Sequence, residues 1–265
     1  SLASPSAPLN IYIQLGPLSM GQTSTQKTTT PGDSYPADAS FSQTPFNGPV
    51  GLISSLGGWW KLTNSMSLGV ATKIRWSTYK LRIDDKILSD TSSNAMALGT
   101  FMYKLNGNFN VEAGFGYHKI DGVFFRYTEG KASAELLNMS THGLRANGAL
   151  SGNFSDLYFR VDVGETFGPA PAATEISVEA NYKLPAPISS FFPVFVGVQY
   201  QFAYRDLSAQ TTGTEISVSG TENLLALTIG ASFGLFGGQS NQSPSVPEVE
   251  PIEELPPAEE GSLDL

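Results

Sequence analysis

Apolar and polar residues alternate along most of this chain, and this period of two constrains the fold more than any other feature. Between Leu225 and Leu235 every second residue is apolar, while Thr228, Gly230 and Ser232 stand between them. Because side chains alternate between the two faces of a strand, the pattern predicts strands with one apolar face rather than amphipathic helices. Ten segments are expected to be strands: residues 9–16, 50–62, 66–80, 94–105, 109–121, 142–151, 157–167, 174–184, 193–206 and 221–236.

The connections between these segments alternate in length. Short ones such as Asn106–Asn108 and Gly152–Asp156 carry the Asn, Gly and Asp residues typical of tight turns. The alternation predicts one antiparallel up-and-down sheet, with turns at one end and long loops at the other. Within one loop, Lys131–Asn138 is expected to form one or two helical turns. The long connections cover residues 17–49, 83–93, 122–141 and 207–220.

Two kinds of all-β barrel fit this pattern, and they differ in the direction of the apolar face. A soluble lipocalin-like barrel binds a ligand in an apolar interior, whereas a transmembrane barrel turns its apolar face to lipid and its polar face to the lumen. Only 15% of the residues are charged, which is low for a water-exposed surface. The polar faces consist mainly of Gly, Ser, Asn and Gln, which suit a crowded interior. We therefore expect a transmembrane barrel of about ten strands, with eight as the alternative.

Aromatic residues on the apolar faces support the membrane interpretation. They gather near both ends of the expected strands, as at the two interfaces of a membrane with water. At the short-turn end they are Trp60, Tyr103, Phe109, Tyr182 and Phe233, and at the loop end they are Trp76, Tyr117 and Tyr204.

The last expected strand carries a further signal in Thr228, Gly230, Phe233 and Leu235. These residues resemble the insertion signal in the closing strand of bacterial outer-membrane barrels. Over about residues 9–236 the chain resembles small barrels of the OmpA type. The resemblance implies export with removal of a signal peptide, insertion by the barrel-assembly machinery, periplasmic turns and termini, and loops outside the cell. Membrane lipid is then the main partner.

Two domains are expected: a transmembrane barrel at 1–237 and an acidic, proline-rich periplasmic tail at 238–265. The tail contributes most of the net charge of −9, and such a chain is not expected to bind nucleic acid. No thiolate metal site or disulfide is available, because the chain has no cysteine.

Eleven charged residues are predicted to line the lumen. Their balance leaves two interpretations open: an ion-paired lumen filled by side chains, with a structural or envelope-organising role, or a narrow, weakly anion-preferring diffusion pore. The residues are Lys61, Lys73, Arg75, Lys104, Glu112, Arg145, Arg160, Asp162, Glu179, Lys183 and Arg205.

Small residues on the outer face predict a contact between protomers, which would assemble the barrels as a ring. The alternative is that small residues only fit the curvature of the wall. The residues are Ser54, Gly58, Thr72, Ala95, Ala97 and Gly99. Neither His118 nor His142 lies in a recognisable catalytic pattern, so no enzyme activity, cofactor or metal is expected.

Overall fold

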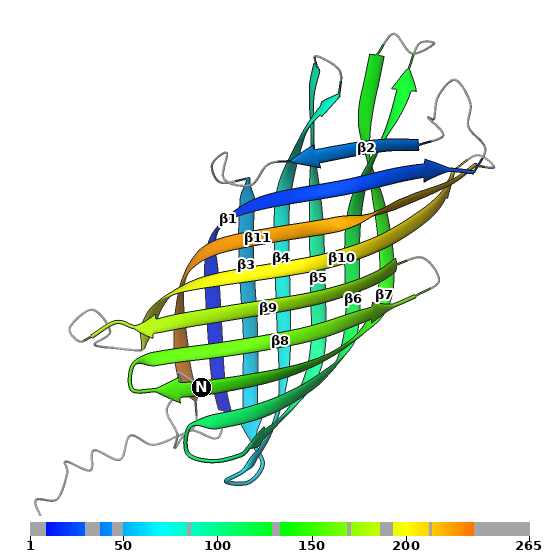
Figure 1. Ribbon diagram of the computed structural model, residues 1–265. Coiled ribbons are helices and arrows are strands. Elements are labelled where there is room, and N and C mark those ends of the chain that lie inside the picture. The colour runs from blue at the N-terminus through cyan, green and yellow to red at the C-terminus, as the bar shows by residue number, and fades with distance from the viewer. Residues whose placement is uncertain are drawn as a thin grey trace, which may run out of the picture.

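The chain forms a closed antiparallel β-barrel (Figure 1). The computed structural model describes residues 9–29, 38–43, 50–83, 86–128, 133–168, 171–185, 193–211 and 214–235. The strands follow the order β11-β10-β9-β8-β7-β6-β5-β4-β3-β1-β2, and pairing of β1 with β11 closes the wall. The wall thus has ten strands, and β2 is an extra strand beside β1.

The strands run from 11 to 22 residues except for β2, which has six. Their bounds are β1 Leu9–Thr28, β2 Asp38–Gln43, β3 Gly51–Lys61, β4 Met66–Ile83, β5 Lys86–Lys104, β6 Phe109–Thr128, β7 Ser133–Phe154, β8 Leu157–Phe167, β9 Pro171–Lys183, β10 Val194–Thr211 and β11 Thr214–Leu235. Among these residues no helix is long and apolar enough to cross a membrane.

All ten predicted strands are present, and the alternative of eight strands is wrong. At the loop end most of them are longer than predicted. β6 reaches Thr128 and β7 begins at Ser133, so most of the loop expected at 122–141 is a hairpin. The helical turns expected at Lys131–Asn138 are wrong, because Ser133–Asn138 belong to β7. Lys131 and Ala132 lie outside the described residues, as does the predicted tail at 238–265.

A second correction concerns residues 17–49, which were expected to be irregular. β1 continues through Thr28, and β2 pairs with its second half, where β3 no longer reaches. The buried Gln43 completes the junction. Its Nε2 donates to Met20 O (3.2 Å), and its Oε1 accepts from Lys80 N–H (3.0 Å). One side-chain amide therefore joins β1 to β4 where no strand pair does so.

The apolar faces of the strands point outward. Leu227 and Ile229 are 63% and 57% exposed, whereas Gln199 and Arg145 in the interior are each 2% exposed. The aromatic residues predicted for two belts lie on the outer surface toward both ends. Trp60, Tyr103, Tyr182, Trp76, Tyr117 and Tyr204 are exposed, and Phe109 and Phe233 are half-buried.

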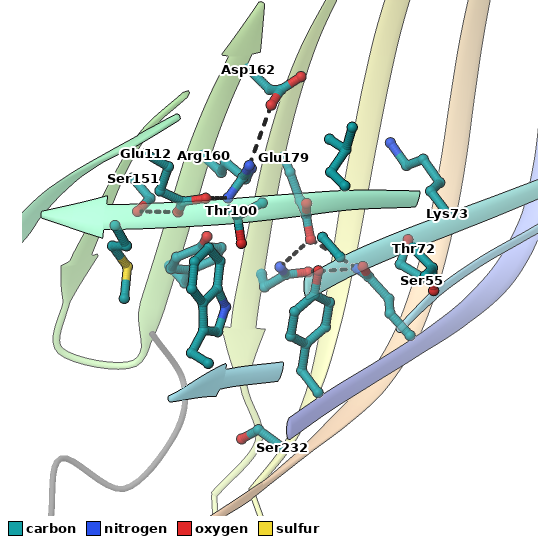
Figure 2. A pocket seen from close by; sticks show the side chains of 18 of the residues that line it. Ser55, Thr72, Lys73, Thr100, Glu112, Ser151, Arg160, Asp162, Glu179 and Ser232 are labelled. Carbon is teal, nitrogen blue, oxygen red and sulfur yellow. Dashed lines mark hydrogen bonds and ion pairs between the residues drawn. The ribbon is translucent and has the colours of Figure 1, made fainter. Parts of the chain in front are cut away.

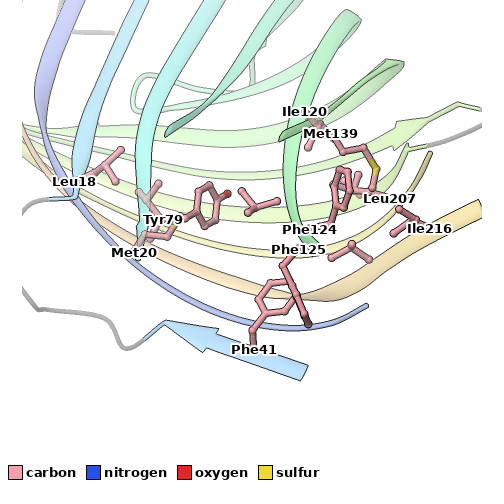
Figure 3. Close-up of a cluster of buried hydrophobic side chains, with 14 of the residues drawn as sticks. Leu18, Met20, Phe41, Tyr79, Ile120, Phe124, Phe125, Met139, Leu207 and Ile216 are labelled. Atoms are coloured by element: carbon pink, nitrogen blue, oxygen red, sulfur yellow. The ribbon is translucent and has the colours of Figure 1, made fainter. Parts of the chain in front are cut away.

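The apolar core lies inside the loop-end half of the barrel (Figure 3). β1, β3, β4, β6, β7, β9, β10 and β11 contribute to it, and Phe41 of β2 packs edge-on against Phe125, with 6.3 Å between the ring centroids. Its fully buried members include Met20, Tyr79, Ile120 and Ile216. This cluster, called the apolar plug below, leaves the polar part of the lumen on the short-turn side.

Candidate functional site

Four arginines, of which Arg75, Arg145 and Arg205 are buried and Arg160 is half-buried, form a layer with four acids across the middle of the lumen. In the part of this layer nearer the loop end, Glu222 accepts from both Arg75 and Arg205, with 3.1 Å between Arg205 Nη2 and Glu222 Oε1. Arg205 also lies 3.4 Å from Glu175, which accepts from Arg145 at 2.7 Å. Arg205 pairs with acids on its neighbours β9 and β11, whereas Arg75–Glu222 and Arg145–Glu175 connect strands that are not neighbours in the wall.

The part of this layer nearer the short-turn end is centred on Arg160. It pairs with Glu112, and its Nη2 lies 3.3 Å from Asp162 Oδ2. Asp162 in turn lies 3.9 Å from Arg145, which links the two parts. We call these eight residues the ion-pair layer: Arg75, Arg145, Arg160, Arg205, Glu112, Asp162, Glu175 and Glu222.

Sequence reasoning missed Glu175 and Glu222. Both could have been found from the alternation, because Glu175 shares a face with Glu179, and Glu222 shares one with Thr228. With them, the interior acids balance the four arginines and Lys73. The excess of positive charge that favoured an anion-preferring pore therefore disappears from this part of the lumen.

Five of the eleven predicted lumen residues lie outside this layer. Lys73 and Glu179 line the lumen on its short-turn side. Lys61, Lys104 and Lys183 are each the last residue of their strands, β3, β5 and β9, at the short-turn rim. Lys61 and Lys183 are half-buried there, and Lys104 is exposed. The alternation assigns a side of the wall but does not say how far along the barrel axis a residue sits.

Three cavities follow one another through the lumen and shrink toward the loop end. The largest, about 130 Å³, lies on the short-turn side and is drawn in Figure 2. A second of about 40 Å³ shares Lys73 and Asp162 with it, and a third of about 20 Å³ shares Arg205 with the second. The ion-pair layer and the apolar plug thus reduce the space step by step.

The hairpin of β6 and β7 reaches across the loop end of the barrel. Gln26 Nε2 of β1 donates to Phe125 O of β6 (3.0 Å), and Phe125 N–H donates to Gln26 Oε1 (2.9 Å). Three strands separate β1 from β6 around one side of the wall, and five around the other. These bonds therefore span the lumen. Val123 and Phe124 of the same hairpin belong to the apolar plug.

The residues of the predicted insertion signal lie in β11, which closes the barrel against β1. Thr228 faces inward and accepts from Gln14 Nε2 of β1 at 2.7 Å. Gly230 lies beneath the ring of Phe195, where an added Cβ would be 2.3 Å from the ring. Phe233 faces outward, and Leu235 pairs with Leu9.

The predicted protomer-contact residues lie on the outer surface of β3, β4 and β5, where they alternate with the exposed Leu56, Val70 and Ile74. Strand register brings Thr72 between Leu56 and Ala97, and Gly99 pairs with Val70. Ala97 and Gly99 are exposed, while Ser54, Gly58, Thr72 and Ala95 are half-buried.

The two histidines lie on opposite sides of the wall. His118 faces the lumen, with its Nδ1 2.8 Å from Thr166 Oγ1, which also accepts from Arg145. His142 is on the outer surface, stacked on Tyr117 and hydrogen-bonded to its hydroxyl. Within the described ranges, no three His, Cys, Asp or Glu side chains gather as they would around a metal ion.

Comparison with known proteins gives structural likenesses alone, since the sequence matches no family model and no curated protein. The outer-membrane protease OmpT of Escherichia coli is 13% identical, with 87% of this chain and 98% of that chain covered and a TM-score of 0.44. Ail, the attachment invasion locus protein of Yersinia pestis, is 9% identical, with 85% and 99% covered and a TM-score of 0.35. The toluene transporter TodX of Pseudomonas putida is 9% identical, with 83% and 89% covered and a TM-score of 0.32. Because these identities are low and the TM-scores are below 0.5, the description of the fold rests on the strand pairing of this chain itself.

Proposed function

We propose that this chain is an integral β-barrel of the bacterial outer membrane with a structural, envelope-organising role and a closed lumen. One observation carries the proposal: the interior is occupied by the ion-pair layer and, beyond it, by the apolar plug. A barrel filled in this way offers no continuous aqueous path. It offers a stiff wall that holds loops on one side and termini on the other.

The outward apolar face supports a membrane location. Hydrocarbon offers no hydrogen bonds to backbone groups, so strands cross a membrane only as a closed barrel, which the pairing of β1 with β11 provides. An even number of wall strands returns both ends of the barrel to one side, where Leu9 pairs with Leu235. We propose that this side is periplasmic, with the acidic tail there and the long hairpins outside. Insertion by the barrel-assembly machinery and the OmpA-type relationship belong to the same proposal.

The two alternatives have less support. An anion-preferring pore needs unpaired cations along an open path, yet each arginine of the ion-pair layer has a carboxylate partner. A soluble lipocalin-like barrel needs an apolar interior throughout, yet Leu227, Ile229 and Val196 are exposed while Gln199 is buried.

Conductance in planar lipid bilayers tests the closed lumen. The wild-type barrel should insert without steady current. Steady ion-selective current from single wild-type barrels would contradict the proposal.

A shortened variant supplies a matched control for this test. Ile120 and Thr141 are paired in the register of β6 with β7, so joining them through an Asn-Gly turn removes the hairpin without shifting the strands. This variant loses much of the apolar plug and keeps the ion-pair layer. It should conduct brief, small currents, which also verifies that inserted barrels are detected.

We also propose that the outer surface at Ser54, Gly58, Thr72, Ala95, Ala97 and Gly99 packs against a neighbouring barrel, so that several protomers form a ring. Close approach of two walls is easiest where side chains are small. Native mass spectrometry in mild detergent tests this contact. Oligomers should dissociate when Ala97→Leu and Gly99→Leu are combined, and a wild-type protein that is entirely monomeric would contradict it.

A further inference from the structure

The largest of the three cavities described above has the features of a binding site for a small molecule. It extends from Asn10 and Ser232, close to the short-turn end, up to Lys73 at the level of the ion-pair layer. The loop end is closed above it by the apolar plug, so molecules reach the cavity from the short-turn side. Its volume of about 130 Å³ holds roughly ten water molecules, or one solute of about ten non-hydrogen atoms.

Two charged side chains lining this cavity stand apart from the ion pairs. No hydrogen bond or ion pair joins Lys73 to any other residue in the described part of the chain, and Glu179 has no cation within 4.0 Å there. Glu179 instead accepts from two amides, Gln14 Nε2 at 3.0 Å and Asn181 Nδ2 at 2.6 Å, both through Oε1. Figure 2 draws Lys73 and Glu179 from separate strands with no bond between them.

The other charges around the cavity are already neutralised. Arg160 pairs with both Glu112 and Asp162, and Asp162 also lies 3.9 Å from Arg145, so each of these charges has an opposite charge beside it. What remains is one ammonium on β4 and one carboxylate on β9. A simple anion would be attracted by Lys73 but repelled by Glu179. A simple cation would be attracted by Glu179 but repelled by Lys73. A ligand that carries both charges satisfies both groups.

Neutral groups of the wall also lack partners. Thr100 and Asn147 line the cavity, but Thr100 Oγ1 and Asn147 Oδ1 are themselves buried in the wall and make no hydrogen bond with the described residues. Buried polar atoms without a partner are costly unless water or a ligand reaches them. Beside them the wall is apolar, with Trp59, Leu98 and Met102 among its members. Such a surface suits a hydrocarbon side chain.

We propose that this cavity binds one zwitterionic molecule of the size of an α-amino acid with an apolar side chain. Lys73 Nζ donates to the ligand carboxylate, and Glu179 accepts from the ligand ammonium. The apolar side chain of the ligand lies against Trp59 and Met102. The proposed ligand binds in the cavity on the short-turn side. The proposal is therefore tested by measuring ligand binding, independently of the conductance test for a closed lumen.

Isothermal titration calorimetry on the full chain in detergent tests the proposal with three related probes. They are L-leucine, 4-methylpentanoate, which lacks the ammonium, and 3-methylbutylamine, which lacks the carboxylate. Leucine should bind saturably at millimolar concentration, and each analogue should bind roughly 10- to 100-fold more weakly, the effect of one lost charge-assisted hydrogen bond. No saturable leucine binding, or equal binding of either analogue, would overturn the proposal and leave a water-filled cavity or a site for one charge.

Variants locate the site. Lys73→Met and Glu179→Gln should each weaken leucine binding roughly 10- to 100-fold. Lys61→Met at the rim and Glu165→Gln on β8 change the same charges away from the cavity and should leave it unchanged. Heat-modifiable mobility on SDS gels verifies that each variant folds. If a site variant does not fold, the comparison of the three probes on the wild-type chain decides the proposal alone.

Discussion

Replacing Glu222 by glutamine should strongly destabilise the barrel, because this one carboxylate serves two arginines. Glu222 is 4% exposed and accepts from Arg75 and Arg205. Arg205 keeps Glu175 as a partner, but Arg75 has no other carboxylate among the ion pairs of the described residues. A buried charge that loses its partner typically costs about 3–5 kcal/mol, and the Arg75 guanidinium is in that position.

The assay is urea unfolding of the barrel in lipid vesicles, followed by tryptophan fluorescence. Glu165→Gln is the matched control: Glu165 accepts from Thr174 Oγ1 and belongs to no ion pair of the described chain. It should change the free energy of unfolding by less than about 1 kcal/mol. The dependence on urea concentration should stay the same in both variants, since the folded wall is unchanged.

A double variant distinguishes the cost of an unpaired charge from the cost of a changed side-chain shape. When Arg75→Met accompanies Glu222→Gln, the unpaired charge disappears, and the barrel should recover most of the roughly 3–5 kcal/mol. If Glu222→Gln alone costs less than about 1 kcal/mol, water reaches Arg75 in the folded barrel. The reasoning that the middle of the lumen is closed is then wrong.

Three further predictions concern the hairpin, the inner wall and the lipid face. Gln26→Leu removes both bonds to Phe125 and should speed hydrogen exchange in the β6–β7 hairpin by an amount equal to about 1–3 kcal/mol, whereas Thr25→Val on the outer face should not. Gly57→Val should block folding because an added Cβ would lie 2.4 Å from the ring of Tyr12, and Tyr12→Leu should restore heat-modifiable mobility. Leu227→Arg should cost about 2–4 kcal/mol in vesicles, and Ser219→Arg less than about 1 kcal/mol, as read from the same urea titrations.

The strands and their faces were predictable because lipid imposes one rule on every wall strand between the two aromatic belts. Val196, Val198 and Tyr200 alternate with Gly197 and Gln199, and the structure exposes the apolar members. Partners across the lumen were not predictable in this way. The pairs Arg75–Glu222 and Arg145–Glu175 join strands that are not neighbours in the wall, and their formation depends on how far the strands slide past one another when the barrel closes.

The lengths of the strands were underestimated for a different reason. Residues 120–125 of β6 are buried on both faces. One face contacts the apolar plug, and the other face is also covered. Such a segment shows no alternation, so Val123, Phe124 and Phe125 gave no strand signal. β2 was missed because its six residues are too few to display a period, and because its partner β1 was predicted to end at residue 16.

The direction of the apolar face reverses along single strands, and in the proposed membrane barrel this reversal marks where the lipid ends. In β11, Leu225, Leu227 and Ile229 face outward, but nearer the loop end the inward residues Ile216 and Val218 are the apolar ones. β10 changes in the same way, from Tyr204 facing outward to the buried Leu207. Outside the membrane the wall meets water, so the ordinary rule of apolar residues inside applies again. One barrel therefore obeys two rules. The apolar plug is the core of its water-exposed part, which explains why the lumen closes at the level where the outer surface turns polar.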